Sequence, residues 1–150
     1  MSRKSAKVAA LIKECQPGGA DPHYLAYFEC FNRGAYYEAH DVLETLWLPQ
    51  KQGPNGLFYK GLIQLAGAFV HLQKARPGPA TALFNLALAN LERYPAEHEA
   101  LDIEAVRALI QNWLARTARL GAQAWAAETA PQLRLREFVS DAEVCHNKTS

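Results

Sequence analysis

The sequence predicts an all-α fold, a compact array of antiparallel helical hairpins with about six helices in a single domain covering residues 1–150. Almost no stretch alternates apolar with polar residues, so the period-two pattern of a β-strand is missing. Alanine and leucine dominate, and clusters of proline and glycine divide the chain into helix-sized pieces. With 150 residues, of which 49% are hydrophobic and 21% charged, the chain has the size and composition of one globular domain.

The charge balance argues against nucleic acid and membrane partners. Sixteen basic and fifteen acidic residues give a formal net charge of +1, which creates no field that attracts DNA, RNA or an anionic membrane. The longest apolar stretch, residues 56–72, is interrupted by Lys60, Gln64 and His71. It is therefore too polar for a membrane-spanning helix.

The cysteines and the first residues predict the compartment. Three widely spaced cysteines without a C-x-x-C pair argue against a thiolate zinc site or a redox pair. The opening MSRKSAKVAALIKECQ has an apolar run too short for a signal peptide. Free thiols without an export signal predict a cytoplasmic protein.

Helix boundaries are marked clearly in the first part of the chain. A first helix is predicted over residues 3–15, before a Pro-Gly-Gly sequence. Asp21 then supplies an N-cap, and Pro22 suits the first position of a second helix. That helix is expected to end near Arg33, because Gly34 is free to adopt the left-handed conformation that ends many helices.

The middle of the chain predicts three more helices. The third covers residues 35–48 and stops before Pro49, which cannot donate a backbone hydrogen bond. A polar loop leads to the fourth, over residues 56–74. The fifth is predicted to start at Pro79 and to reach Tyr94.

A sixth helix is predicted over residues 97–120, ending at Gly121. The last thirty residues contain AWAAETA and QLRLREFV, which predict one more short helix. Residues 141–150 are expected to form a frayed tail.

Ionisable residues in the third helix lie unusually close to its packing face. At 100° per residue, His40 falls on the apolar side, within about 20° of Trp47. Glu44 lies one turn later and is able to touch His40. Glu38 and Asp41 are expected to stand apart, either in solvent or favouring the positive end of the helix.

The fourth helix is apolar around most of its circumference and therefore predicted to be central. Its one polar stripe contains Lys60, Gln64, His71 and Lys74, with Gly67 inside it and Gly61 beside it. These glycines allow another helix or a ligand to approach the backbone closely. If the third and fourth helices form a hairpin, this stripe faces His40 and Glu44.

Two interpretations of this polar cluster stay open. A buried histidine bonded to a carboxylate is a common structural network. Alternatively, the cluster is a functional pocket in which Glu44 tunes His40 for acid–base chemistry. A divalent metal held by His40, Glu44 and His71 is a further version, since two histidines and one carboxylate suit iron, manganese or zinc. The lack of an H-E-x-x-H or Glu-x-x-His motif argues against that version.

The stretches FNRGAYYEAHDVLETLW and FYKGLIQLAGAFVHL resemble the family called domain of unknown function 309. Its pattern is an N-x-G turn, an E-A-H-(E/D)-x-x-E-x-x-W helix, and a G-L-I-Q helix ending in histidine. The resemblance covers about residues 24–94 and departs from the pattern at Asp41, where glutamate is more usual. The matching positions are Asn32, Gly34, Tyr36 or Tyr37, Glu38, His40, Asp41, Glu44, Trp47, Gly61, Gln64 and His71.

The resemblance implies a small all-helical bundle and carries no established activity. It favours the interpretation that the polar cluster acts as one functional site. The first functional hypothesis is therefore a small-ligand or metal-assisted site, hydrolysis included. Its catalytic residues would be His40 and Glu44, and its ligand-binding residues Trp47, Tyr59, Gln64 and His71.

The second hypothesis is a non-enzymatic interaction module or homodimer whose polar cluster fixes helix pairing. Trp113 lies in an apolar stripe that predicts a core or dimer face, and Trp125 is expected either to cover a hydrophobic edge or to anchor an interface. Asn90 is expected to bond a neighbouring backbone, and His98 to be exposed.

Overall fold

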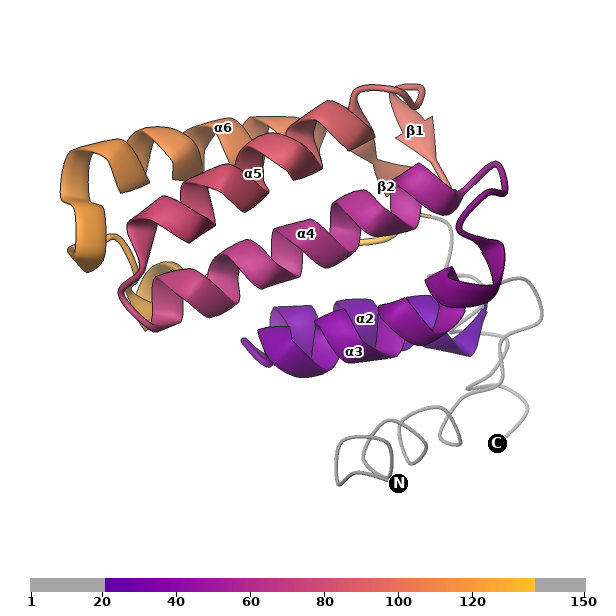
Figure 1. Ribbon diagram of the computed structural model, residues 1–150, viewed down its shortest axis with the longest axis horizontal. Helices are drawn as coiled ribbons and strands as arrows, with labels where there is room; N and C mark the ends of the chain where they lie inside the picture. Colours follow the sequence, from indigo (N-terminus) through magenta and orange to yellow (C-terminus); the bar gives the residue numbers. More distant parts are fainter. Residues whose placement is uncertain (1–20, 137–150) are drawn as a thin grey trace.

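The computed structural model describes residues 21–136, and this part of the chain contains five α-helices (Figure 1). The predicted all-α fold is confirmed. The predicted first helix and the tail at 141–150 lie outside the described residues. The five helices are α2 (Pro22–Asn32), α3 (Tyr36–Trp47), α4 (Gly56–Gln73), α5 (Pro77–Leu91) and α6 (Ile103–Leu120).

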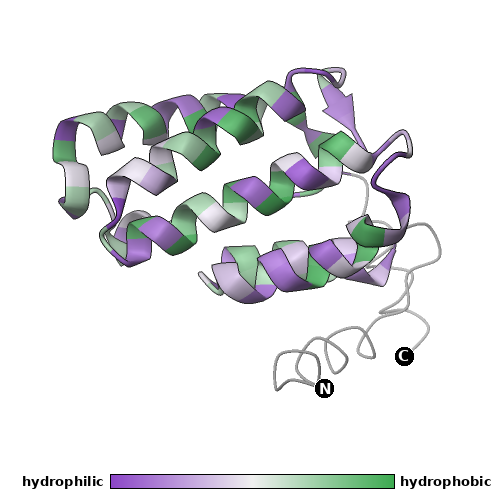
Figure 2. Ribbon diagram, in the orientation of Figure 1, coloured by the Kyte–Doolittle hydropathy of each residue, from purple (hydrophilic) through white to green (hydrophobic). Residues whose placement is uncertain are grey.

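The helices form layers around α4. Figure 1 shows α4 between α5 and α6 on one side and α2 and α3 on the other. Twelve of its eighteen residues are buried, and its ribbon in Figure 2 is largely apolar, so the predicted central position of this helix is confirmed. Within residues 21–136, no helix is both long and apolar enough to cross a membrane.

Phe69 of α4 lies at the centre of the aromatic core. Its ring centroid is 5.1 Å from those of Tyr36 and Trp113 and 5.7 Å from that of Phe31. Trp113 also stacks on Trp125 at 6.0 Å. Both tryptophans therefore pack on the core, and neither supplies an exposed apolar face; dimerisation stays a prediction.

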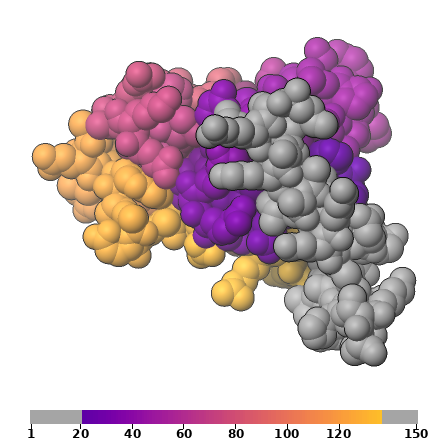
Figure 3. Space-filling view, turned by 90° about the horizontal axis from the view of Figure 1, so that it is seen from below, coloured from indigo at the N-terminus to yellow at the C-terminus, as the bar shows by residue number. Residues whose placement is uncertain are grey.

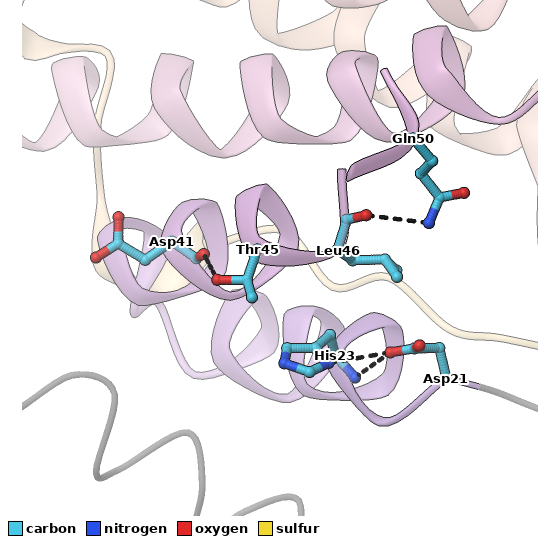
Figure 4. Close-up of polar contacts among 6 residues, drawn as sticks. All are labelled: Asp21, His23, Asp41, Thr45, Leu46 and Gln50. Carbon is cyan, nitrogen blue, oxygen red and sulfur yellow. Dashed lines mark hydrogen bonds and ion pairs between the residues drawn. The ribbon is translucent and has the colours of Figure 1, made fainter. Parts of the chain in front are cut away.

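Local hydrogen bonds fix several helix ends. The carboxylate of Asp21 accepts from the backbone N–H of His23 at 2.7 Å, which caps α2 as predicted (Figure 4). Gly34 has a φ of 79° after α2, the left-handed conformation expected there. After α3, the chain continues as a 3₁₀ turn (Leu48–Gln50). In that turn the Gln50 amide donates to the Leu46 carbonyl at 3.0 Å (Figure 4).

The predicted bounds of the fifth helix are wrong at both ends. The helix begins at Pro77, and Pro79 fits inside its first turn, where backbone N–H groups lack helical partners in any case. It ends three residues before Tyr94. The Tyr94 hydroxyl instead accepts from Phe58 N at 2.9 Å and donates to the Pro54 carbonyl at 2.8 Å. These distant bonds tie the ring to the start of α4.

The sixth helix begins later than predicted, at Ile103 rather than at residue 97. The residues before it form a two-stranded antiparallel hairpin, β1 (Glu97–His98) and β2 (Leu101–Asp102). Asp102 caps α6 by accepting from Ala105 N at 3.0 Å. A side-chain cap at this position provides a better helix start than the residues upstream.

The predicted last helix is also wrong where the structure describes it. Residues 127–129 form a 3₁₀ turn, and residues 130–136, called here the C-terminal segment, form no helix. Leu135 pairs with Leu101 in an antiparallel bridge. From below, the surface of this end of the chain lies beside that of α2 and α3 (Figure 3).

Asn32, at the end of α2, holds the C-terminal segment. Its side-chain amide donates to the Leu133 carbonyl at 2.8 Å, and its side-chain oxygen accepts from Leu133 N at 2.7 Å. The amide of Gln132 also donates to the Asn32 carbonyl at 2.9 Å. The Asn32 side chain thus offers the segment the same donor and acceptor that a neighbouring strand would offer.

Candidate functional site

A pocket of about 240 Å³ lies between α3, α4 and α5. Three of the predicted site residues, His40, Gln64 and His71, form part of its wall. The remaining wall is mostly apolar, which is the usual character of small-molecule sites. The complete lining is Tyr37, His40, Ile63, Gln64, Gly67, Val70, His71 and Leu83.

Gln64 is the most deeply buried polar residue of this pocket, with 9% of its surface exposed. The Asn90 amide donates to its side-chain oxygen at 2.8 Å, so Asn90 bonds a side chain rather than the predicted backbone. Among residues 21–136, Asn90 is the one hydrogen-bond partner of the Gln64 side chain. The Gln64 amide nitrogen is therefore left as a donor.

His71 forms another part of the wall, and its Nδ1 atom is buried without a partner in the described part of the chain. Burial lowers the pKa of this imidazole, and the nearby cations Arg76 and Lys74 lower the pKa further. The ring is therefore neutral near pH 7. A buried N–H without a partner costs more than a bare acceptor, which favours the tautomer with its proton on Nε2.

His40 is one-third exposed and lies between two carboxylates of α3. Its Nδ1 is 3.4 Å from Asp41 Oδ1, and its Nε2 is 4.0 Å from Glu44 Oε2. The expectation that Asp41 stands apart is wrong. Figure 4 shows another polar contact of Asp41, whose backbone carbonyl accepts from the Thr45 hydroxyl at 3.3 Å.

The other predicted residues lie outside the pocket wall. Glu44 contacts His40, and Trp47 lies farther along α3. Tyr59 lies about 140° around α4 from Gln64 by helical spacing. Its ring packs 5.5 Å from that of Phe58, and burial raises the pKa of its hydroxyl.

Metal ligands do not converge in the described part of the chain. No three His, Cys, Asp or Glu side chains of residues 21–136 are placed to hold a metal ion. His40, Glu44 and His71 therefore do not form the three-ligand group that their residue types suggest. The arrangement is better suited to hydrogen bonding than to coordination.

Two glycines of α4 allow α5 to approach closely, as the sequence predicted for small residues there. A Cβ atom added at Gly61 would lie 3.1 Å from Leu91, and one added at Gly67 would lie 3.2 Å from Leu83. Gly67 also lines the pocket. Sequence reasoning did not identify Leu83 as a wall residue, because that requires the pairing of α4 with α5.

Comparison with known families matches the part of the chain that builds this site. Residues 24–83 match the family model for the domain of unknown function 309. Over this segment the chain is similar to that family. The resemblance stated from the sequence is confirmed, although the matched segment ends before the predicted limit at residue 94. All residues of the pocket wall lie inside the matched segment.

One curated protein is also similar to this chain. A protein of Aquifex aeolicus (strain VF5), named uncharacterized protein, is 26% identical over 84 residues, which are 56% of this chain and 25% of the relative. The chain thus spans about a quarter of the length of the curated relative it matches.

Proposed function

We propose that the pocket between α3, α4 and α5 binds a small, largely apolar molecule that carries one hydrogen-bond acceptor. Its volume of about 240 Å³ exceeds that of an engineered cavity of about 150 Å³ that binds benzene. A single ring with a short substituent therefore suits this space. The apolar part of the ligand would contact Ile63, Val70 and Leu83.

The observation that carries the proposal is the state of Gln64. Asn90 holds the oxygen of this buried amide and leaves its nitrogen as a donor. This nitrogen has no protein partner among the described residues and is not fully shut off from solvent, so it is open to a ligand. A ligand acceptor beside Gln64 would take the place of water at this donor. The neutral ring of His71 adds a second polar group without adding charge.

A role for His40 in catalysis stays a prediction. An imidazole with a carboxylate near each nitrogen is a suitable acid–base group. Glu44, the other predicted catalytic residue, contacts His40 from outside the pocket wall. Binding is the part of the hypothesis that the pocket geometry supports.

Binding of neutral probes tests the proposal. Benzamide and benzyl alcohol would be titrated into ¹⁵N-labelled protein while the side-chain amide signals of Gln64 and Asn90 are followed by NMR. Gly67→Ala and Val70→Phe place atoms in the pocket and are expected to weaken binding, by about tenfold for the larger change. Gly78→Ala is the matched control, because a Cβ there meets nothing within 4 Å.

Binding in the pocket should change the NMR signal of the Gln64 side-chain amide. We expect the probes to shift the Gln64 amide and to bind the Gly78→Ala variant as they bind the original chain. Equal affinity for the Val70→Phe variant and the original chain would place the probes elsewhere. Failure of both probes to shift the Gln64 amide would contradict the proposal.

A further inference from the structure

Trp47 has two lysine side chains over its indole ring. Lys51 Nζ lies 5.4 Å and Lys60 Nζ lies 5.3 Å from the ring centroid. The lysines come from different segments, since Lys51 follows the 3₁₀ turn after α3 and Lys60 belongs to α4. No carboxylate of residues 21–136 lies within 4.0 Å of either ammonium group. Two positive charges thus lie near one ring, with no carboxylate partner for either among residues 21–136.

This cluster lies near the pocket residues on α3 and α4, closer to the loop that joins the two helices. On α3, Trp47 lies seven residues after His40, and on α4, Lys60 lies four residues before Gln64. The two helices run in opposite directions (Figure 1), so both steps lead toward the loop that joins them. At 1.5 Å per residue, they span about 10 Å and about 6 Å along the helix axes.

We propose that Lys51, Lys60 and Trp47 form an anion subsite for a ligand whose apolar part occupies the pocket. This inference rests on the proposed function and specifies its ligand class, an amphipathic molecule ending in a carboxylate or phosphate. Both ammonium groups lie near the ring, and each would attract an anion bound beside it. The indole holds both cations close to the place where the anion binds.

Glu44 limits which anions fit. Its carboxylate lies on α3 between His40 and Trp47, and it contacts His40 Nε2 at 4.0 Å. An acidic group attached directly to the ring in the pocket would lie close to this carboxylate. An acidic group at the end of a flexible chain reaches the lysines beyond it. The subsite therefore favours a terminal anion several bonds from the apolar part.

A matched set of probes tests the subsite. 6-Phenylhexanoate, 6-phenylhexyl phosphate and the neutral 6-phenylhexan-1-ol share the apolar part and differ in the end group. Their affinities would be measured by calorimetry at low ionic strength for the original chain and for the Lys51→Gln/Lys60→Gln double variant. Lys74→Gln is the control, since it removes the charge of an exposed lysine at the other end of α4.

The expected result is a loss confined to the anions. The double variant should bind the carboxylate or the phosphate about two- to thirtyfold more weakly, whereas the affinity for the alcohol stays unchanged. Whichever anion binds the original chain more tightly identifies the preferred end group.

Three results would overturn the inference. Equal affinity of the anions for the double variant and the original chain would leave the lysines as partners of Trp47 alone, while binding of the alcohol would still support the pocket. An equal loss in the Lys74→Gln variant would show that the anions respond to overall charge. If no probe binds at all, the proposed function fails, and the subsite fails with it.

Discussion

The polar groups of the pocket and those around Asn32 differ in how many of their hydrogen bonds are formed within the protein. At Asn32, both ends of the side-chain amide bond the backbone of Leu133 at 2.7 and 2.8 Å. In the pocket, the Gln64 amide is bonded at its oxygen alone, and His71 Nδ1 has no partner among the described residues. One region is saturated with hydrogen bonds, and the other keeps unused donors and acceptors.

This difference separates structural from functional polarity. A saturated amide that joins residues about a hundred positions apart stabilises the fold, and its removal leaves two backbone groups without partners. Polar groups that keep free donors or acceptors in a preformed pocket add little to stability and are available to a ligand.

Loss of the Asn32 side chain should have the largest effect on stability. Asn32→Ala leaves the N–H and carbonyl of Leu133 without their partners, so the free energy of unfolding should fall by about 1–3 kcal/mol. For a chain of this size, the melting temperature would fall by about 3–10 °C. Asn112→Ala, an exposed position on α6, is the control and should change the free energy by less than about 0.5 kcal/mol. An equally small change at Asn32 would contradict a structural role.

The two glycines of α4 should respond oppositely to alanine. At Gly61, a Cβ would lie 3.1–3.3 Å from atoms of Leu91 and Asn90, both packed on α4, so Gly61→Ala should destabilise the fold by about 1–2 kcal/mol. At Gly67, the contact is the end of the Leu83 side chain at 3.2 Å. Since alanine favours a helix by about 1 kcal/mol over glycine, Gly67→Ala should leave stability unchanged or raise it. Denaturant unfolding of both variants measures this, and equal destabilisation would show that the pocket is packed as tightly as the core.

Replacement of His71 should cost little. His71→Leu removes an imidazole whose Nδ1 bonds nothing in the described part of the chain, so the free energy of unfolding should change by less than about 0.5 kcal/mol or should rise. A loss of 2 kcal/mol or more in chemical denaturation would assign His71 to a structural network.

The smallest expected effect is a pH dependence of stability that involves His71. Its pKa in the folded chain is lowered from the ordinary value of 6.5, first by burial and then by Arg76 and Lys74. The unfolded chain therefore binds this proton more tightly. The contribution of His71 to stability is complete above the unfolded pKa and is lost as the pH falls through the folded pKa. Between pH 7.5 and 5.5, the original chain should lose slightly more stability than His71→Leu, and parallel curves would contradict the lowered pKa.

Much of the fold follows from local sequence signals. Asp21 caps the first described helix, Gly34 ends it in the left-handed conformation, and the apolar circumference of residues 56–73 makes that helix central. Local sequence signals fail where contacts between distant segments determine the structure. The hairpin before Ile103 and the C-terminal segment depend on bonds to Tyr24 and Asn32, which no local pattern contains. His98, expected to be exposed, instead bonds Asn55 at 2.7 Å.

In the candidate site too, local periodicity predicted the residues of a single helix but not those that depend on helix pairing. Periodicity placed His40 on the packing face of α3, and it placed Gln64 and His71 on one stripe of α4; the structure lines one pocket with all three. Tyr59 lies about 140° from Gln64 on the same helix, so its place away from the pocket was already implied by helical spacing. Leu83 was missed because it comes from a third helix.

The most direct test of the central claim is a crystal structure of the chain with benzamide. We predict the ring between Ile63, Val70 and Leu83, with the benzamide carbonyl oxygen about 2.8–3.2 Å from Gln64 Nε2 and the bond from Asn90 to Gln64 intact. A pocket that excludes benzamide, with the Gln64 nitrogen bonded to another protein group, would show that the polar cluster is structural and would contradict the account.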